Sequence, residues 1–165
     1  MNILIEEINK ALKNKCWLAA LSLSLSIPDI CGKIEHPEIT GCGAVGKRYE
    51  MWYSVYVEKY YKLDDFVLFN GKQCYALRCE FFHSGNNRIN SNLLNTFQFS
   101  VPNSDENNAI NSYYESKSLG KRLVLDIAHL SQILTIGAEE WKNKTEKDLS
   151  LLKDFSLFNP STFYY

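Results

Sequence analysis

The sequence predicts a mainly α-helical protein with a small antiparallel β-ribbon inserted before the last long helix. Two observations predict the helices: apolar residues recur every three or four positions over long stretches, and one of these stretches is aromatic. Short segments near residues 97 and 121 read as strands and predict the ribbon. Because 165 residues suffice for one domain, we expect a single domain over 1–165, with the ribbon and its loop at about 90–125.

A first helix is expected to run up to Pro28. Its apolar stripe consists of Ile5, Ile8, Leu12, Cys16, Ala19 and Leu23. Residues 21–27 alternate with serine as a strand does, but the helical pattern that leads into them and the Ala19-Ala20 pair favour a helix. Since proline interrupts helices, we expect the chain to leave the helix near Pro28.

The segment 28–46 is expected to be a loop. It ends in GCGAVGK at 41–47, which matches G-x-G-x-x-G and nearly matches a phosphate-binding loop. No strand precedes it, however, and Arg48 stands where a phosphate-binding loop needs Ser or Thr for magnesium. We interpret it as a flexible connection between helices.

Two further helices are expected in the middle of the chain. The first, over about 46–61, carries an aromatic stripe of Tyr49, Trp52, Tyr53, Tyr56 and Tyr60. Such a stripe could stack bases, but at helical spacing it is typical of a core. The next helix is expected to begin at Asn70, a good N-cap, and to end near Phe82, with Gly85 as the C′ residue.

The remainder of the chain is expected to hold the ribbon and a last long helix. The strands are expected at 97–101 and 121–125, with a polar loop at 102–112. The helix after Asp126 presents one apolar face, formed by Ile127, Leu130, Leu134, Ala138 and Trp141. A short helix is expected around 149–155.

The net charge of −1 excludes a protein that binds nucleic acid through a positive charge spread over its whole surface. The five cysteines are odd in number and form no C-x-x-C, which favours a reduced, cytoplasmic protein. Cys31, His36 and Cys42 lack a fourth ligand for zinc, so no metal or cofactor is expected. The apolar stretch at 17–27 is too short to span a bilayer, which takes about 20 residues, and we expect no membrane contact.

Arg78 stands out in the helix expected before Gly85. On a helical wheel it lies in the middle of an arc of apolar residues, and a buried guanidinium needs an anionic partner. That partner is either a carboxylate of this chain, with Asp29, Glu35, Asp64 and Asp65 as candidates, or an anion bound in a cleft or at an interface.

His83 follows near the expected end of the same helix. An imidazole transfers protons near neutral pH, and a guanidinium stabilises charge on phosphate oxygens in a transition state. An arginine and a histidine that meet in one cleft therefore suit phosphodiester chemistry.

At these residues the sequence resembles the HEPN superfamily, the higher eukaryotes and prokaryotes nucleotide-binding domain. Many members carry Arg, four to six residues and then His near the end of a helix in an up-and-down bundle, and Arg78 and His83 have four residues between them. The residue after Arg78 is Cys79, where many active members have Asn, Asp or His.

The resemblance implies a homodimer whose Arg-His pairs face each other, and metal-independent RNA cleavage that leaves a 2′,3′-cyclic phosphate. It assigns proton transfer to His83 and phosphate binding to Arg78. It also implies a toxin or phage-defence effector, with an antitoxin or defence-system protein as a partner. The alternative is a non-catalytic module of the same shape that binds nucleic acid, a nucleotide or a protein.

Other polar residues are weaker candidates for the same site. Lys47, Arg48 and Arg88 are expected to contact substrate phosphates and Asn86 to supply a polar contact, although basic side chains are more often solvated surface. His36 precedes a proline in a loop, and His129 is expected to be a partly buried, satisfied side chain of the last long helix.

Overall fold

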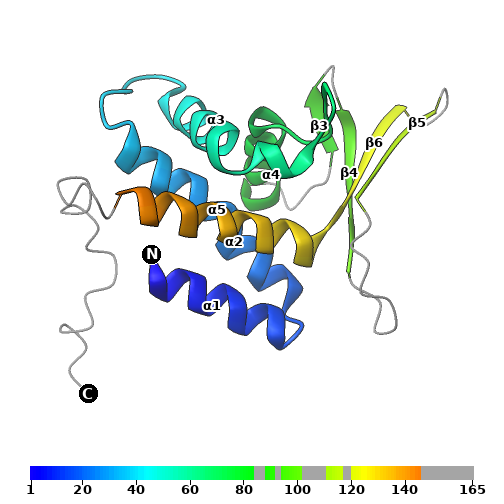
Figure 1. Cartoon of the computed structure of the whole chain (residues 1–165). Helices are drawn as coiled ribbons and strands as arrows, with labels where there is room; N and C mark the ends of the chain where they lie inside the picture. Colours follow the sequence, from blue (N-terminus) through cyan, green and yellow to red (C-terminus); the bar gives the residue numbers. More distant parts are fainter. Residues whose placement is uncertain (84–87, 92–93, 102–110, 117–119, 146–165) are drawn as a thin grey trace.

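Helices dominate the computed structural model, which describes residues 1–83, 88–91, 94–101, 111–116 and 120–145. Its helices are α1 (Asn2–Lys13), α2 (Trp17–Glu35), α3 (Ala44–Tyr56), α4 (Gly71–His83) and α5 (Ile127–Thr145), with a 3-10 turn, η1 (Glu58–Tyr61). Helix α2 contacts each of the other four α-helices, and a sheet stands at one end of the bundle (Figure 1). The prediction of a mainly helical protein is confirmed.

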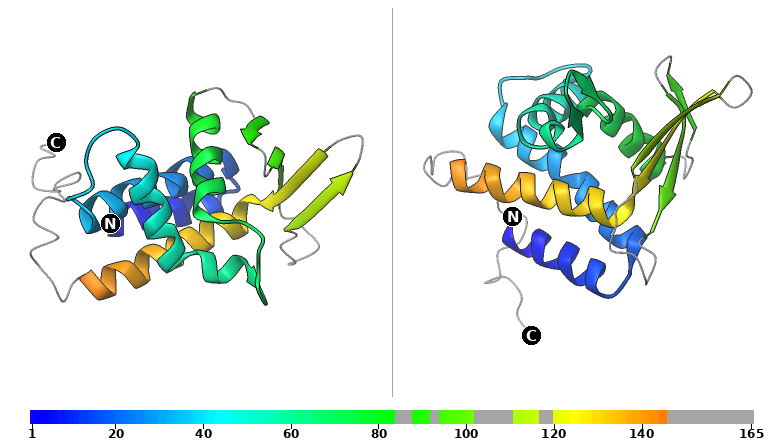
Figure 2. Two further views of the ribbon diagram at one scale, coloured as in Figure 1. Left: turned by 90° about the horizontal axis from the view of Figure 1, so that it is seen from above. Right: turned by 45° about the vertical axis from the view of Figure 1, so that its right-hand side comes forward.

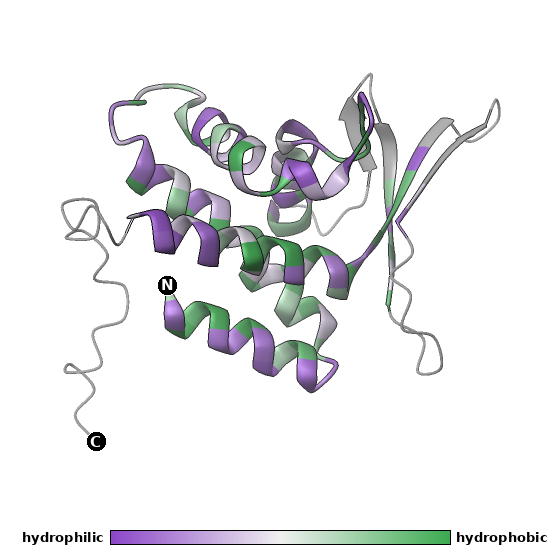
Figure 3. Cartoon of the chain, viewed as in Figure 1, coloured by the Kyte–Doolittle hydropathy of each residue, from purple (hydrophilic) through white to green (hydrophobic). Residues whose placement is uncertain are grey.

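The prediction of one N-terminal helix is wrong, because the chain breaks between α1 and α2. Lys15 takes a left-handed backbone conformation, with φ of 57°. The Asn14 side chain donates a hydrogen bond to the carbonyl of Lys10, and the backbone N–H of Cys16 donates to Ala11. These contacts satisfy the last carbonyls of α1, so that α2 can fold back along it. The two helices are in contact, and α1 carries both apolar (green) and hydrophilic (purple) residues along its length (Figure 3).

The expected end of the helix at Pro28 is also wrong. Helix α2 runs through Pro28 to Glu35. A proline removes one backbone hydrogen bond from the helix, but Ile27 and Cys31 on either side of it are fully buried and hold the segment in place. In the part of the chain that the structure describes, α2 is the one helix long and apolar enough to cross a membrane, by length and composition alone.

The aromatic stripe forms the core, as predicted. Tyr49, Trp52, Tyr53 and Tyr56 of α3 are almost fully buried, and Trp52 stacks on Tyr56 at 5.2 Å between ring centroids. Tyr60 is 40% exposed, because α3 ends at Tyr56 and the chain tightens into η1. A hairpin that the sequence did not predict follows, with strands β1 (Lys62–Leu63) and β2 (Phe66–Val67).

The sheet contains β3 (Arg88–Ser91), β4 (Leu94–Ser100), β5 (Ser112–Ser116) and β6 (Gly120–Asp126), in the order β3-β4-β6-β5 (Figure 2). The two strands expected to form an antiparallel ribbon, β4 and β6, instead pair in parallel, with Phe97 opposite Leu123. The reason is β5, which lies between them in the chain and takes the antiparallel place beside β6.

One face of this sheet closes the end of the bundle. Phe97, Leu123 and Leu125 are fully buried, and Phe97 meets Phe69 edge to face at 5.7 Å. Gly85 as a helix C′ residue and the short helix around 149–155 lie outside the described residues, as does the loop expected at 102–112 except for its last two residues, of which Ser112 begins β5.

Glycines set how closely the helices around α3 approach. A Cβ on Gly32 of α2 would lie 2.7 Å from the backbone oxygen of Arg48, and one on Gly71 of α4 would lie 2.9 Å from that of Glu50. A Cβ on Gly46 would meet the Tyr75 ring at 2.8 Å. Helices α2 and α4 therefore each lie against the α3 backbone, which brings their facing side chains together.

Candidate functional site

Helix α4 carries both residues that the sequence singled out. It begins at a reciprocal cap, in which the N–H of Gln73 donates to the Asn70 side chain and the N–H of Asn70 donates to the Gln73 side chain. Its last described residue is His83, one residue beyond the end expected near Phe82. Cys74 and Leu77 face the core, and this fixes the side of the helix that Arg78 presents to α2.

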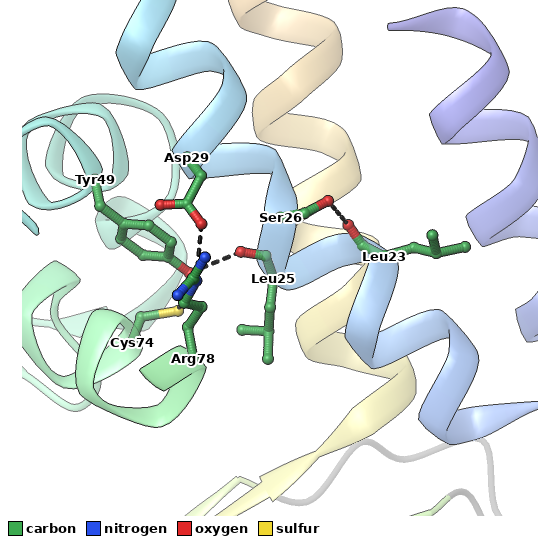
Figure 4. Close-up of polar contacts among 7 residues, drawn as sticks. All are labelled: Leu23, Leu25, Ser26, Asp29, Tyr49, Cys74 and Arg78. Atoms are coloured by element: carbon green, nitrogen blue, oxygen red, sulfur yellow. Dashed lines mark hydrogen bonds and ion pairs between the residues drawn. The ribbon is translucent and has the colours of Figure 1, made fainter. Parts of the chain in front are cut away.

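Arg78 forms an ion pair with Asp29 of α2, one of the four carboxylates considered from the sequence. Its Nε donates to Asp29 Oδ2 at 2.8 Å, as Figure 4 shows. The guanidinium also lies over the Phe82 ring, 5.4 Å from its centroid. The Arg78 side chain stays 25% exposed, so the pair lies at the surface of the bundle rather than sealed inside it.

The Arg78 guanidinium offsets only part of the cost of burying the charged Asp29 carboxylate. Burial raises its pKa, and the opposing effect of the Arg78 guanidinium does not fully cancel that rise. Its second oxygen, Oδ1, is buried without a hydrogen-bond partner. Burial acts to lower the pKa of Arg78, but Asp29 and Cys79 together outweigh it and the net shift is upward, so Arg78 is always charged.

A buried polar contact lies next to the Asp29–Arg78 ion pair, on the core side of α4. The Tyr49 hydroxyl, on α3, lies 3.3 Å from the backbone oxygen of Leu25 and 3.3 Å from the Cys74 sulfur, and Figure 4 shows it next to Arg78. Burial raises the pKa of Cys74 to about 12, so this thiol is neutral and unsuited to nucleophilic attack. The contact ties α2, α3 and α4 together beneath Arg78.

His83 is exposed at the last position of α4. It makes no hydrogen bond or ion pair with any residue that the structure describes. Five residues of helix turn the chain by about 140° beyond whole turns, so Arg78 and His83 leave α4 in different directions. The helix by itself therefore does not bring the two side chains together.

The weaker candidates divide into three groups. Lys47 is exposed in the first turn of α3. Arg48 instead donates to the backbone oxygen of Ile39 at 2.6 Å, and so holds the preceding loop. The backbone of Arg88 lies in β3, but its side chain is not among those that the structure describes. Asn86 is not among the described residues.

The glycine-rich segment connects two helices, as predicted. Gly41 and Gly43 have φ values of 90° and 77°, which favour glycine, and Gly43 is the N-cap of α3. The segment follows α2 rather than a strand, which agrees with the interpretation that it is not a dinucleotide-binding turn.

The other histidines do not join this site. The Asn111 amide nitrogen donates to His129 Nδ1 at 2.9 Å, which confirms its satisfied, partly buried setting. His36 lies 3.6 Å from Glu38 at the end of α2. Within the described ranges, no three His, Cys, Asp or Glu side chains group as metal ligands, and all five cysteines are free.

The sequence missed one member of the site, Phe82, which it placed among the apolar residues around Arg78. The signal was the spacing of four, which puts an aromatic ring under a guanidinium on a helix. Comparison with known proteins adds nothing to this assignment: no family model matches the chain, nor does any curated protein or solved structure.

Proposed function

We propose that this chain is a metal-independent endoribonuclease of the HEPN type. The observation that carries the proposal is the arrangement on α4: a partly exposed arginine, held through Nε, on a helix that ends at an exposed histidine. A guanidinium held through Nε has further terminal N–H groups that can bind a phosphate, and an exposed imidazole exchanges protons near neutral pH.

The proposed reaction is an internal transfer within RNA. The ribose 2′-oxygen attacks the adjacent phosphorus, its proton passes to a His83 imidazole, and the bond from phosphorus to the 5′-oxygen breaks. The leaving 5′-oxygen takes a proton from an imidazolium or from water, which leaves a 2′,3′-cyclic phosphate. Arg78 stabilises the charge that builds on the non-bridging oxygens.

A homodimer is part of the proposal, because the helix by itself does not bring Arg78 and His83 together. A two-fold axis near the α2 and α4 surfaces would place the Arg78 of one subunit beside the His83 of the other. The exposed apolar side chains of Leu18 on α2 and Phe82 on α4 suit such a contact.

Cleavage of a mixed-sequence RNA in EDTA tests this function. Arg78→Ala and His83→Ala should each reduce cleavage by at least about 10²-fold, the usual contribution of one such group. Two surface variants of matched chemistry serve as controls: Lys47→Ala should have a small effect and His36→Ala none. Sedimentation of all four variants should give the wild-type dimer. Equal cleavage after either α4 substitution would refute the assigned roles.

A non-catalytic binding module is the second candidate, and the ion pair itself favours it. Arg78 already has a carboxylate partner, as a purely structural arginine does. Under this alternative, wild-type protein binds RNA or a partner protein without cleaving RNA. A titration with labelled RNA, run beside the cleavage assay on the same preparation, separates the two candidates.

A further inference from the structure

The contact between Asp29 and Arg78 joins one oxygen of the carboxylate to the Nε side of the guanidinium. Arg78 donates to Asp29 from Nε, and three of the four N–H bonds of its two terminal nitrogens point away from that edge of the guanidinium. The next residue, Cys79, lies close enough to contribute to the raised pKa of Arg78, and the Phe82 ring covers one face of the guanidinium. With one edge and one face held, the guanidinium has little freedom to rotate.

The carboxylate is poorly arranged for stability. An ion pair that stabilises a fold satisfies both carboxylate oxygens, because a buried acceptor without a partner costs free energy. Asp29 leaves Oδ1 buried and unpartnered, while its other oxygen contacts Arg78. The arrangement suits orientation of the guanidinium better than stabilisation of the bundle.

The position of Asp29 is itself fixed by close backbone packing. It lies on α2 one turn before Gly32, whose approach to the Arg48 backbone leaves no room for a Cβ. Helix α4 is fixed against α3 in the same way at Gly71. Close helix packing therefore sets the separation of the α2 and α4 backbones that carry Asp29 and Arg78.

We propose that Asp29 is a positioning residue, which holds Arg78 through Nε so that its terminal nitrogens face the phosphate of the substrate. This inference rests on the proposed ribonuclease function. It separates two properties of Asp29: its acceptor oxygen, which orients the guanidinium, and its negative charge, which opposes phosphate binding. Asparagine keeps an acceptor and removes the charge, whereas alanine removes both.

The test compares Asp29→Asn and Asp29→Ala, with Asp65→Ala as a control carboxylate in the exposed β1–β2 turn. For Asp29→Ala we expect kcat to fall at least 30-fold while KM changes less than threefold. For Asp29→Asn we expect kcat within threefold of wild type and a lower KM, because the competing charge is gone. Asp65→Ala should match wild type. Thermal unfolding checks that each variant is folded.

Nitrogen-15 NMR of the arginine Nε–H groups gives a readout that does not depend on activity. The Arg78 signal, assigned by its loss in Arg78→Lys, should be protected from exchange in wild type and Asp29→Asn but not in Asp29→Ala. Loss of kcat in Asp29→Asn equal to that in Asp29→Ala, or an unprotected Arg78 signal in wild type, overturns the inference. A protected signal in a wild-type protein that does not cleave RNA refutes the ribonuclease function and leaves the held guanidinium confirmed.

Discussion

Replacement of Gly32 by alanine tests whether close helix packing builds the site. Two effects of this change have opposite signs. Alanine favours a helix over glycine by about 1 kcal/mol. The new Cβ, however, would lie 2.7 Å from the backbone oxygen of Arg48 and 3.0 Å from its carbonyl carbon. Both atoms belong to helix backbone, so no side chain can rotate to make room.

The structure decides which effect wins. An ordinary Cβ contact begins near 3.4 Å, so α2 and α3 must separate by about 0.7 Å. Overpacking of this kind costs roughly 1–3 kcal/mol, and a contact between two backbones belongs at the upper end. We expect Gly32→Ala to lower the free energy of unfolding by about 2 kcal/mol, which corresponds to a fall in Tm of roughly 4–8 °C for a domain of this size.

Urea and thermal unfolding measure this loss, with Gly137→Ala as the matched control. A Cβ on Gly137 would have more room, because its nearest atoms are side-chain carbons of Val57 and Trp52 at 3.0 and 3.2 Å and the Tyr56 backbone oxygen at 3.3 Å. The control should stay within about 1 kcal/mol of wild type. A Gly32→Ala protein as stable as wild type, or more stable, would refute the reasoning. RNA cleavage should fall with stability in this variant, because Asp29 moves with α2.

Three more predictions concern single groups. Tyr56→Phe should cost about 1 kcal/mol in urea unfolding, because the Tyr56 hydroxyl donates to Glu35 Oε1 at 3.0 Å while Lys144, 3.7 Å from that oxygen, stays as a partner. Burial lowers the pKa of His129 in the folded protein, so the unfolded chain binds the extra proton first as pH falls below about 6.5. The free energy of unfolding should therefore decrease with falling pH there, and His129→Asn should flatten that part of the stability curve. Cys79→Asn should raise kcat for RNA cleavage, because an amide beside Arg78 donates to a phosphate oxygen more strongly than a thiol; a lower kcat would contradict this.

Helical spacing predicted α4 and the setting of Arg78 well. The wheel placed Arg78 among apolar residues and required a partner, and Asn70 marked the start of the helix. The wheel could not choose Asp29 among the candidate carboxylates, because the choice depends on α2 continuing through Pro28. With the helix expected to end there, Asp29 fell in a loop.

The other differences between the predicted and the observed fold have physical causes that cannot be inferred from a sequence pattern. Alternation predicts a strand but not its neighbour, so the parallel pairing of β4 and β6 could not be foreseen. A single left-handed residue, Lys15, separates α1 from α2 without interrupting the apolar spacing. The close approaches at Gly32 and Gly71 depend on which backbone lies opposite, and this is settled only by the fold.

The chemistry of the RNA ends tests the ribonuclease proposal most directly. Labelled RNA is incubated with the protein in EDTA, and the new 3′ ends are analysed, with a 2′-deoxy substitution at the cleaved nucleotide as a second substrate. We predict 2′,3′-cyclic phosphate ends from wild type, none from Arg78→Ala or His83→Ala, and no cleavage at the 2′-deoxy position. Cleavage at the 2′-deoxy position, or unchanged products from either variant, would contradict the account.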